Sequence, residues 1–147
     1  MKDDQTIVIA DDDPEDCDLA TEAMRLADMS NPVNIVRDGH ELISYLKNHV
    51  DAEGERKPPA IILLDLNMPR MNGHDALKQI KADPELAHIP IIVMTTSSNE
   101  ADVEETYRLG AQSYLVKPGS FRELVEKFKH LRRYWFETVR RPRERGV

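Results

Sequence analysis

The sequence alternates short apolar runs with longer amphipathic stretches. The first, third and fourth apolar runs consist almost entirely of Ile, Leu, Val and Met, which is typical of strands covered on both faces. Between the runs, apolar residues recur at helical spacing, as Leu19, Ala23 and Leu26 do. The expected strands are Thr6–Ala10, Val33–Arg37, Ala60–Asp65, Pro90–Thr95 and Ser113–Lys117.

Local signals predict where the helices begin and end. Asp13 occupies an N-cap position and Pro14 the first helical position, while Asp16 completes a pattern similar to a capping box. Asp83 precedes a proline and therefore avoids the helical region, and Gly110 is a natural residue to follow a helix. The later helices are expected at about Gly39–Val50, from after Gly73 to before Asp83, at about Asn99–Leu109 and from near Ser120 onward.

This regular alternation of strand and helix predicts an α/β fold with a parallel sheet, right-handed crossovers and helices on both faces. Five such units fit the doubly wound, flavodoxin-like strand order 2-1-3-4-5. In that order a ligand binds beyond the C-terminal strand ends, where strands 1 and 3 meet. We expect one domain with a core over about residues 5–131 and a C-terminal helical extension over about 132–147.

Composition narrows the class of protein. Of 147 residues, 40% are hydrophobic and 32% are charged, which is typical of a globular chain. The net charge of −7 argues against general binding to nucleic acid or a membrane surface, because both are anionic. A single cysteine, Cys17, excludes an internal disulfide. With neither a signal-peptide pattern nor an apolar run of roughly 20 residues, we expect a cytoplasmic protein.

Acidic residues follow two strands that are expected to be neighbours. Strand 1 runs into Asp11, Asp12 and Asp13, and strand 3 ends at Asp65. Helix capping accounts for Asp13, but it does not explain why the other three carboxylates should converge, since like charges repel. A hard divalent cation removes that repulsion, and carboxylate oxygens with water are the ligands that Mg²⁺ prefers. Mg²⁺ would also screen Asp65 against an incoming phosphoryl group.

Thr95 and Lys117 end strands 4 and 5 and are expected at the same edge of the sheet. A lone lysine near a strand end is usually a surface charge, and threonine is common in strands. At the mouth of an acidic pocket, however, Lys117 has a phosphate or carboxylate to bind, and Thr95 can donate its hydroxyl to a phosphoryl oxygen. The acids, the hydroxyl and the ammonium group therefore come from four strand ends and are expected to form one polar site.

These motifs resemble the receiver domains of two-component response regulators. The resemblance is carried by Asp11-Asp12, the segment Leu63–Gly73, Thr95 and the segment Tyr114–Pro118, and it covers essentially the whole chain. It implies that Asp65 accepts a phosphoryl group from the phosphohistidine of a histidine kinase. It further implies a Mg²⁺ site made by Asp12, Asp65 and the backbone carbonyl of Asn67, with Asp11 acting through water.

The same resemblance assigns roles around the acceptor. Lys117 would pair with the phosphoryl group, Thr95 would hydrogen-bond it, and the Lys117–Pro118 peptide would be cis. Tyr114 occupies the position of the family's rotating aromatic residue. Thr95 and Tyr114 would therefore couple phosphorylation to the outer face formed by the fourth helix, the fifth strand and the last helix.

Two further segments resemble stand-alone response regulators that serve phytochrome-type histidine kinases. They are Tyr134–Val139, which is followed by Pro142, and the run Thr95–Glu100. The resemblance implies a phytochrome-type kinase as partner.

Apolar residues in excess of the core predict a homodimer. Leu124, Phe128 and Leu131 fill the core-facing stripe of the last helix and Trp135 continues it, but two adjacent aromatic residues, Trp135 and Phe136, cannot both face one core. A leftover apolar patch commonly binds a second copy through an isologous contact. The expected dimer face consists of Val103, Tyr107, Tyr114, Tyr134, Trp135 and Phe136.

Two other functions compete with a phosphorylated switch. An aspartate-nucleophile phosphatase of the haloacid-dehalogenase type also places an aspartate after a strand, but it needs a second acid two residues later, where this chain has Asn67. An unphosphorylated protein-interaction module on the same fold would have no need for clustered acids. We therefore expect a phosphoacceptor that assists its own phosphorylation and dephosphorylation rather than an enzyme, and that signals by protein contact.

Overall fold

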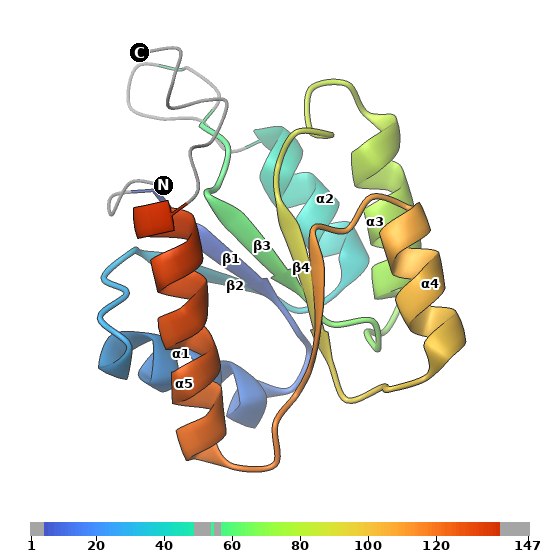
Figure 1. The fold of residues 1–147 in the computed structure, drawn as a ribbon. Helices are drawn as coiled ribbons and strands as arrows, with labels where there is room; N and C mark the ends of the chain where they lie inside the picture. The colour runs from blue at the N-terminus through green and yellow to red at the C-terminus, as the bar shows by residue number, and fades with distance from the viewer. Residues whose placement is uncertain (1–4, 49–53, 55–56, 139–147) are drawn as a thin grey trace.

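The computed structural model describes residues 5–48, 54 and 57–138. One parallel sheet runs through this part of the chain in the order β2-β1-β3-β4-β5, as Figure 1 shows. The predicted α/β fold and strand order are thereby confirmed. The strands are β1 (Ile7–Ala10), β2 (Val33–Val36), β3 (Ile61–Leu64), β4 (Ile91–Thr95) and β5 (Ser113–Val116).

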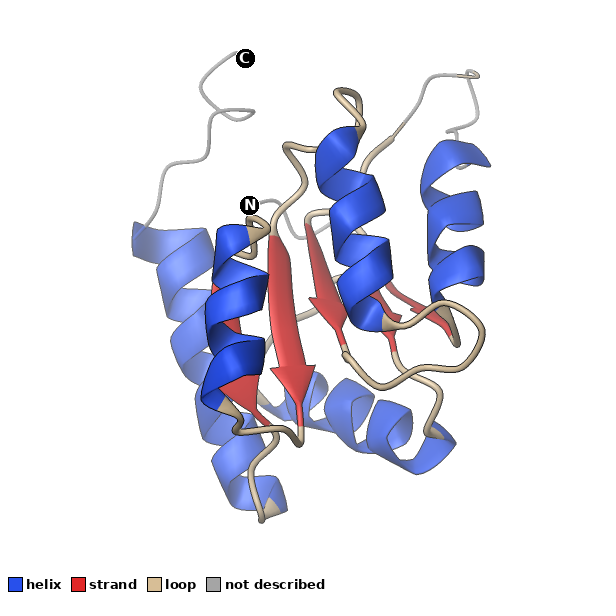
Figure 2. Cartoon of the chain, turned by 90° about the vertical axis from the view of Figure 1, so that its right-hand side faces the viewer, coloured by secondary structure: helices blue, strands red, loops and turns tan. Residues whose placement is uncertain are grey.

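Helices cover both faces of the sheet (Figure 2). One face carries the neighbouring helices α1 and α5, and the other carries α2, α3 and α4 (Figure 1). A π-helical segment, η1 (Arg133–Thr138), continues α5. No helix in the described part of the chain combines the length and apolarity needed to cross a membrane. The helices are α1 (Pro14–Leu26), α2 (Gly39–Asn48), α3 (Gly73–Ala82), α4 (Glu100–Arg108) and α5 (Phe121–Arg132).

The continuous apolar runs form the central strands because both of their faces are buried. In β1, Val8 belongs to the core layer under α2 and α3, while Ile7 and Ile9 belong to the layer under α1 and α5. In β3, Ile62 belongs to the layer under α2 and α3, and Leu63 belongs to the layer under α1 and α5. Alternate side chains of a strand point to opposite faces, so each central strand contributes to two cores.

The predicted helix boundaries agree with the structure wherever it describes them. Asp13 caps α1, its Oδ1 accepting hydrogen bonds from the backbone N–H of Glu15 (3.0 Å) and Asp16 (3.3 Å). The backbone N–H of Asp13 donates to Asp11 Oδ1 (3.0 Å). In a capping box the Asp16 carboxylate would accept this N–H of Asp13. Asp16 therefore does not complete a capping box, because the N–H is already bound to Asp11. Val50, the predicted end of α2, lies outside the described residues.

The apolar stripe of α1 differs from the predicted one. Leu19 and Leu26 are exposed, while Cys17, Ala20 and Met24 are buried against the sheet and α5. Cys17, Ala20 and Met24 belong to the same core layer as Phe128 of α5. Of the three residues at helical spacing, Ala23 is buried as expected, whereas Leu19 and Leu26 are not.

Trp135 is buried, contrary to its expected place on an exposed dimer face. Its exposed fraction is only 6%, and it packs in the same core layer as Phe128. Tyr134 stacks on it, with ring centroids 5.3 Å apart and an interplanar angle of 15°. The side chain of Phe136 and residues 139–147 lie outside the described part of the chain. The division into a core and a C-terminal extension therefore stays a prediction.

Candidate functional site

The four predicted strand-end residues lie together at one edge of the sheet. Asp11 follows β1, Asp65 follows β3, Thr95 ends β4 and Lys117 follows β5. Asp11, Asp65 and Thr95 are buried, although two of them carry a carboxylate. Parallel strands bring their carboxyl ends to one edge, so residues distant in sequence form one polar pocket.

Lys117 is the centre of this pocket. Its Nζ donates hydrogen bonds to Asp11 Oδ2 (2.8 Å), Asp16 Oδ2 (2.8 Å) and Asp65 Oδ2 (2.9 Å). Burial by itself would lower the pKa of Lys117, but the three hydrogen bonds with carboxylates raise that pKa above its ordinary value. The ammonium group therefore stays charged and offsets the repulsion between the acids.

The two buried carboxylates are held through their remaining oxygens. Asp65 Oδ1 accepts hydrogen bonds from the Thr95 hydroxyl (2.9 Å) and from the backbone N–H of Asn67 (3.1 Å). Asp11 Oδ1 accepts the backbone N–H of Asp13. Burial raises the pKa of Asp11 despite the hydrogen bond from Lys117. In each carboxylate, therefore, Oδ1 accepts hydrogen bonds from nearby backbone or hydroxyl groups, and Oδ2 accepts one from Lys117.

Gly73 packs closely against the backbone of Asp65 and Leu66. A Cβ atom on Gly73 would lie 2.4 Å from the Asp65 carbonyl oxygen and 2.6 Å from the Leu66 Cα. The backbone N–H of Gly73 donates to the Leu66 carbonyl (3.0 Å). Only glycine allows α3 to begin this close to the end of β3.

The donor set of the pocket has the chemistry of a divalent-cation site. Asp11 and Asp65 supply carboxylate oxygens, Asn67 follows Asp65 by two residues, and Asp12 follows Asp11 directly and is exposed. Hard cations prefer such oxygen ligands. In the described residues no three acidic, histidine or cysteine side chains are arranged to hold a metal ion. Lys117 occupies the Oδ2 atoms of Asp11 and Asp65, so a cation that used them would have to displace it.

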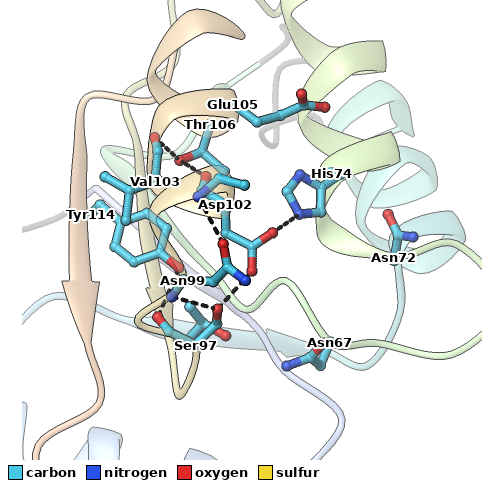
Figure 3. A network of polar contacts seen from close by, with 12 residues as sticks. Asn67, Asn72, His74, Ser97, Asn99, Asp102, Val103, Glu105, Thr106 and Tyr114 are labelled. Carbon is cyan, nitrogen blue, oxygen red and sulfur yellow. Dashed lines mark hydrogen bonds and ion pairs between the residues drawn. The ribbon is translucent and has the colours of Figure 1, made fainter.

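Tyr114 belongs to a polar network beside the pocket (Figure 3). Its hydroxyl donates to the Ser97 carbonyl (2.8 Å), and the Ser97 hydroxyl donates to Asp102 Oδ2 (2.6 Å). His74 Nε2 lies 3.2 Å from Asp102 Oδ1. The network connects β5, the segment between β4 and α4, α4 and α3. Sequence reasoning found Tyr114 but missed His74 and Asp102, because their pairing requires knowledge of how α3 packs beside α4.

The predicted cis peptide at Lys117–Pro118 is wrong, since no peptide bond among the described residues is cis. Trans is the more stable form even before proline. Lys117 also reaches its three carboxylates with this trans bond in place.

Sequence reasoning also missed the contact between Asp16 and Lys117. Asp16 was assigned to capping, whereas its carboxylate points into the pocket from the first turn of α1. The available signal was its place soon after strand 1, whose end reaches the same pocket. A cavity of about 150 Å³ opens next to this contact, with Leu19, Pro118 and Phe121 among its lining residues.

Comparison with known proteins gives consistent similarities over almost the whole chain. A model of the response regulator receiver domain family matches residues 7–129. Response regulator Rcp1 of Synechocystis sp. is 33% identical over 138 residues, which cover 94% of this chain and 93% of Rcp1.

Solved structures show the same likeness in three dimensions. The phosphorylated cyanobacterial phytochrome response regulator RcpA has a TM-score of 0.84 at 33% identity, covering 95% of this chain and 99% of RcpA. The Mn²⁺-bound form of Rcp1 has a TM-score of 0.80 at 33% identity, covering 94% of this chain and 99% of that structure. The fold and the arrangement of strand ends are therefore shared with these proteins.

Proposed function

This chain belongs to the response regulator receiver domain family, and we propose that Asp65 is its phosphoacceptor, taking the phosphoryl group from a histidine kinase. Receiver domains of this family are phosphorylated by histidine kinases. The observation that carries the assignment is the environment of Asp65. It is a buried carboxylate at the end of β3 that is bound by the ammonium group of Lys117 and the hydroxyl of Thr95.

The proposed transfer requires little covalent chemistry from the protein. An oxygen of the Asp65 carboxylate forms a bond to phosphorus while the bond from phosphorus to the histidine nitrogen breaks. The electron pair of that bond leaves with the nitrogen, and an acyl phosphate remains on Asp65. Lys117 and Thr95 already lie within hydrogen-bond distance of Asp65, so both can donate to the phosphoryl oxygens as negative charge develops on them.

We propose Mg²⁺ as the cation of the site. The Mn²⁺-bound structure of Rcp1 supports a divalent metal in this family. Asp12, Asp65 and the backbone carbonyl of Asn67 would hold the ion, and Asp11 would act through water. When bound, the cation would neutralise charge on the transferring phosphoryl group.

A phytochrome-type histidine kinase is the partner we propose. The likeness to the phytochrome response regulator RcpA supports it, together with the sequence resemblance at the C-terminal aromatic segment.

We also propose that Thr95 and Tyr114 transmit phosphorylation to the α4–β5–α5 face, where the chain binds a second copy. The expectations of a cytoplasmic location and of no enzymatic activity on outside substrates stay predictions.

Labelling with a small phosphodonor tests the acceptor. Wild-type protein incubated with phosphoramidate and Mg²⁺ should gain one phosphate by intact-mass spectrometry. Asp65→Asn should abolish the gain, because an amide oxygen is a poor nucleophile, and EDTA should abolish it in the wild type. Asp75→Asn removes an exposed acid on α3 and is the matched control. Phosphate retained by Asp65→Asn would place the acceptor elsewhere.

A further inference from the structure

Asp16 is the one carboxylate around Lys117 that the proposed chemistry leaves unused. Lys117 has three N–H donors on Nζ, and the three bonds go to Asp11, Asp65 and Asp16. The proposed transfer engages Asp65 directly, and the proposed cation draws on Asp11 and Asp65. Once both carboxylates are engaged, Asp16 is the remaining acidic partner of the ammonium group.

The placement of Asp16 suits it to hold Lys117. It lies in the first turn of α1, where its backbone N–H donates to the capping carboxylate of Asp13. Its Oδ2 is 2.8 Å from Lys117 Nζ, as close as the Asp11 contact. The exposed fraction of its side chain is 35%, against 16% for Lys117. A half-buried, charge-assisted bond from a capped helix fixes the direction of a flexible lysine better than an exposed pair does.

We propose that Asp16 is a positioning residue that keeps the Lys117 ammonium beside Asp65 when the cation and the phosphoryl group engage the other two carboxylates. This inference rests on the function proposed above. Asp16 contacts no reacting atom and acts only through Lys117. Without it, Lys117 would lose its last fixed partner just as the phosphoryl group arrives, and part of the orientation needed for transfer would be lost.

Phosphorylation kinetics in paired variants test this role. Rates of Asp65 phosphorylation are measured with phosphoramidate at saturating Mg²⁺ for the wild type, Asp16→Asn, Asp16→Glu and Asp18→Asn. Loss of one charge-assisted hydrogen bond should slow Asp16→Asn about tenfold. Asp16→Glu keeps a carboxylate and should recover most of the rate. Asp18→Asn removes an exposed acid from the same helix and should match the wild type.

Repeating Asp16→Asn in a Lys117→Ala background separates positioning from a general charge effect. If Asp16 acts through Lys117, its substitution should change the rate of the Lys117→Ala protein less than twofold or so, whereas the two effects would multiply for independent sites. Thermal melting of each variant shows that it is folded.

Three results would overturn the inference while leaving Asp65 as the acceptor. They are an Asp16→Asn rate equal to that of Asp18→Asn, an equally slow Asp16→Asn in the Lys117→Ala background, and a faster Asp16→Asn, which would make Asp16 a competitor for Lys117. A wild-type protein that takes no phosphate would instead defeat the proposed function, and the positioning role with it.

Discussion

Lys117 joins three carboxylates that come from separate parts of the chain, Asp11 after β1, Asp16 in α1 and Asp65 after β3. The convergence of parallel strand ends is enough to predict that Asp11, Asp65, Thr95 and Lys117 lie together. The same rule does not place Asp16, because its contact depends on how a helix side chain and a long lysine side chain meet in space. Strand topology places backbones, whereas side-chain direction requires the packed structure.

The structure also changes what is expected of Asp12. If only acids met in the pocket, removing one would relieve repulsion and stabilise the metal-free protein. In the structure Lys117 already binds the buried acids Asp11 and Asp65, and Asp12 is exposed. Asp12→Ala should therefore change the metal-free stability by no more than about 0.5 kcal/mol.

With Mg²⁺ the same substitution should have a clear effect. Binding to the folded state alone stabilises a protein by mass action, so millimolar Mg²⁺ should raise the melting temperature of the wild type. Asp12→Ala should remove that increase because it removes a proposed ligand. Asp18→Ala, an exposed acid on α1, should keep it. Thermal melting with and without Mg²⁺ measures this effect. If Mg²⁺ raises the melting temperature of Asp12→Ala as much as that of the wild type, the cation binds elsewhere.

At the scale of elements, helix ends were more predictable than helix rotation. Asp13, Asn99 and Ser120 each cap a helix where the sequence indicated one, because a cap acts through its own neighbours. The buried face of α1 was predicted less well, because it depends on how α1 packs against α5. A helix cap can be predicted from neighbouring residues in the sequence, whereas the packing of two helices cannot.

Asp38 gives a prediction at this scale because it joins α2 to the segment between β3 and α3. It is buried, its Oδ1 accepts the Glu41 backbone N–H (2.8 Å), and its Oδ2 accepts Arg70 Nε (2.8 Å). The backbone hydrogen bond from Glu41, and then the Arg70 pair, outweigh burial and lower the pKa of Asp38. Asp38→Ala should cost about 1–2 kcal/mol in the free energy of unfolding at pH 7.

The sign of this pKa change fixes the pH dependence. A lowered folded-state pKa stabilises the protein above the unfolded pKa of about 3.9, and that stabilisation is lost as the pH falls through the lower folded value. The difference between wild type and Asp38→Ala should therefore narrow below about pH 4. Urea unfolding across that range measures it. Arg70→Ala, which removes only the exposed partner, should cost less. A difference that widens in acid would contradict the assignment.

At the scale of the whole molecule, the burial of Trp135 changes the predicted dimer face. Trp135 completes the core of its own chain, so truncation after Arg133 would damage folding as well as association. The described residues that remain in the predicted face are Val103, Tyr107, Tyr114 and Tyr134. Tyr107 is 47% exposed and Tyr134 is 46% exposed. Substitutions at these two tyrosines therefore test association more cleanly than truncation does.

Sedimentation at tens of micromolar should show a wild-type dimer that Tyr107→Ala and Tyr134→Ala weaken, because each removes exposed aromatic area from the contact. Leu26→Ala, which removes an exposed apolar side chain from α1, should sediment as the wild type does. Phosphorylation should shift the dimer affinity by about 1–3 kcal/mol, since Tyr114 belongs to the predicted face and its hydroxyl donates to the carbonyl of Ser97, two residues after Thr95. If the wild type sediments as a monomer with and without phosphate, the exposed tyrosines serve the kinase or a target, and the homodimer is excluded.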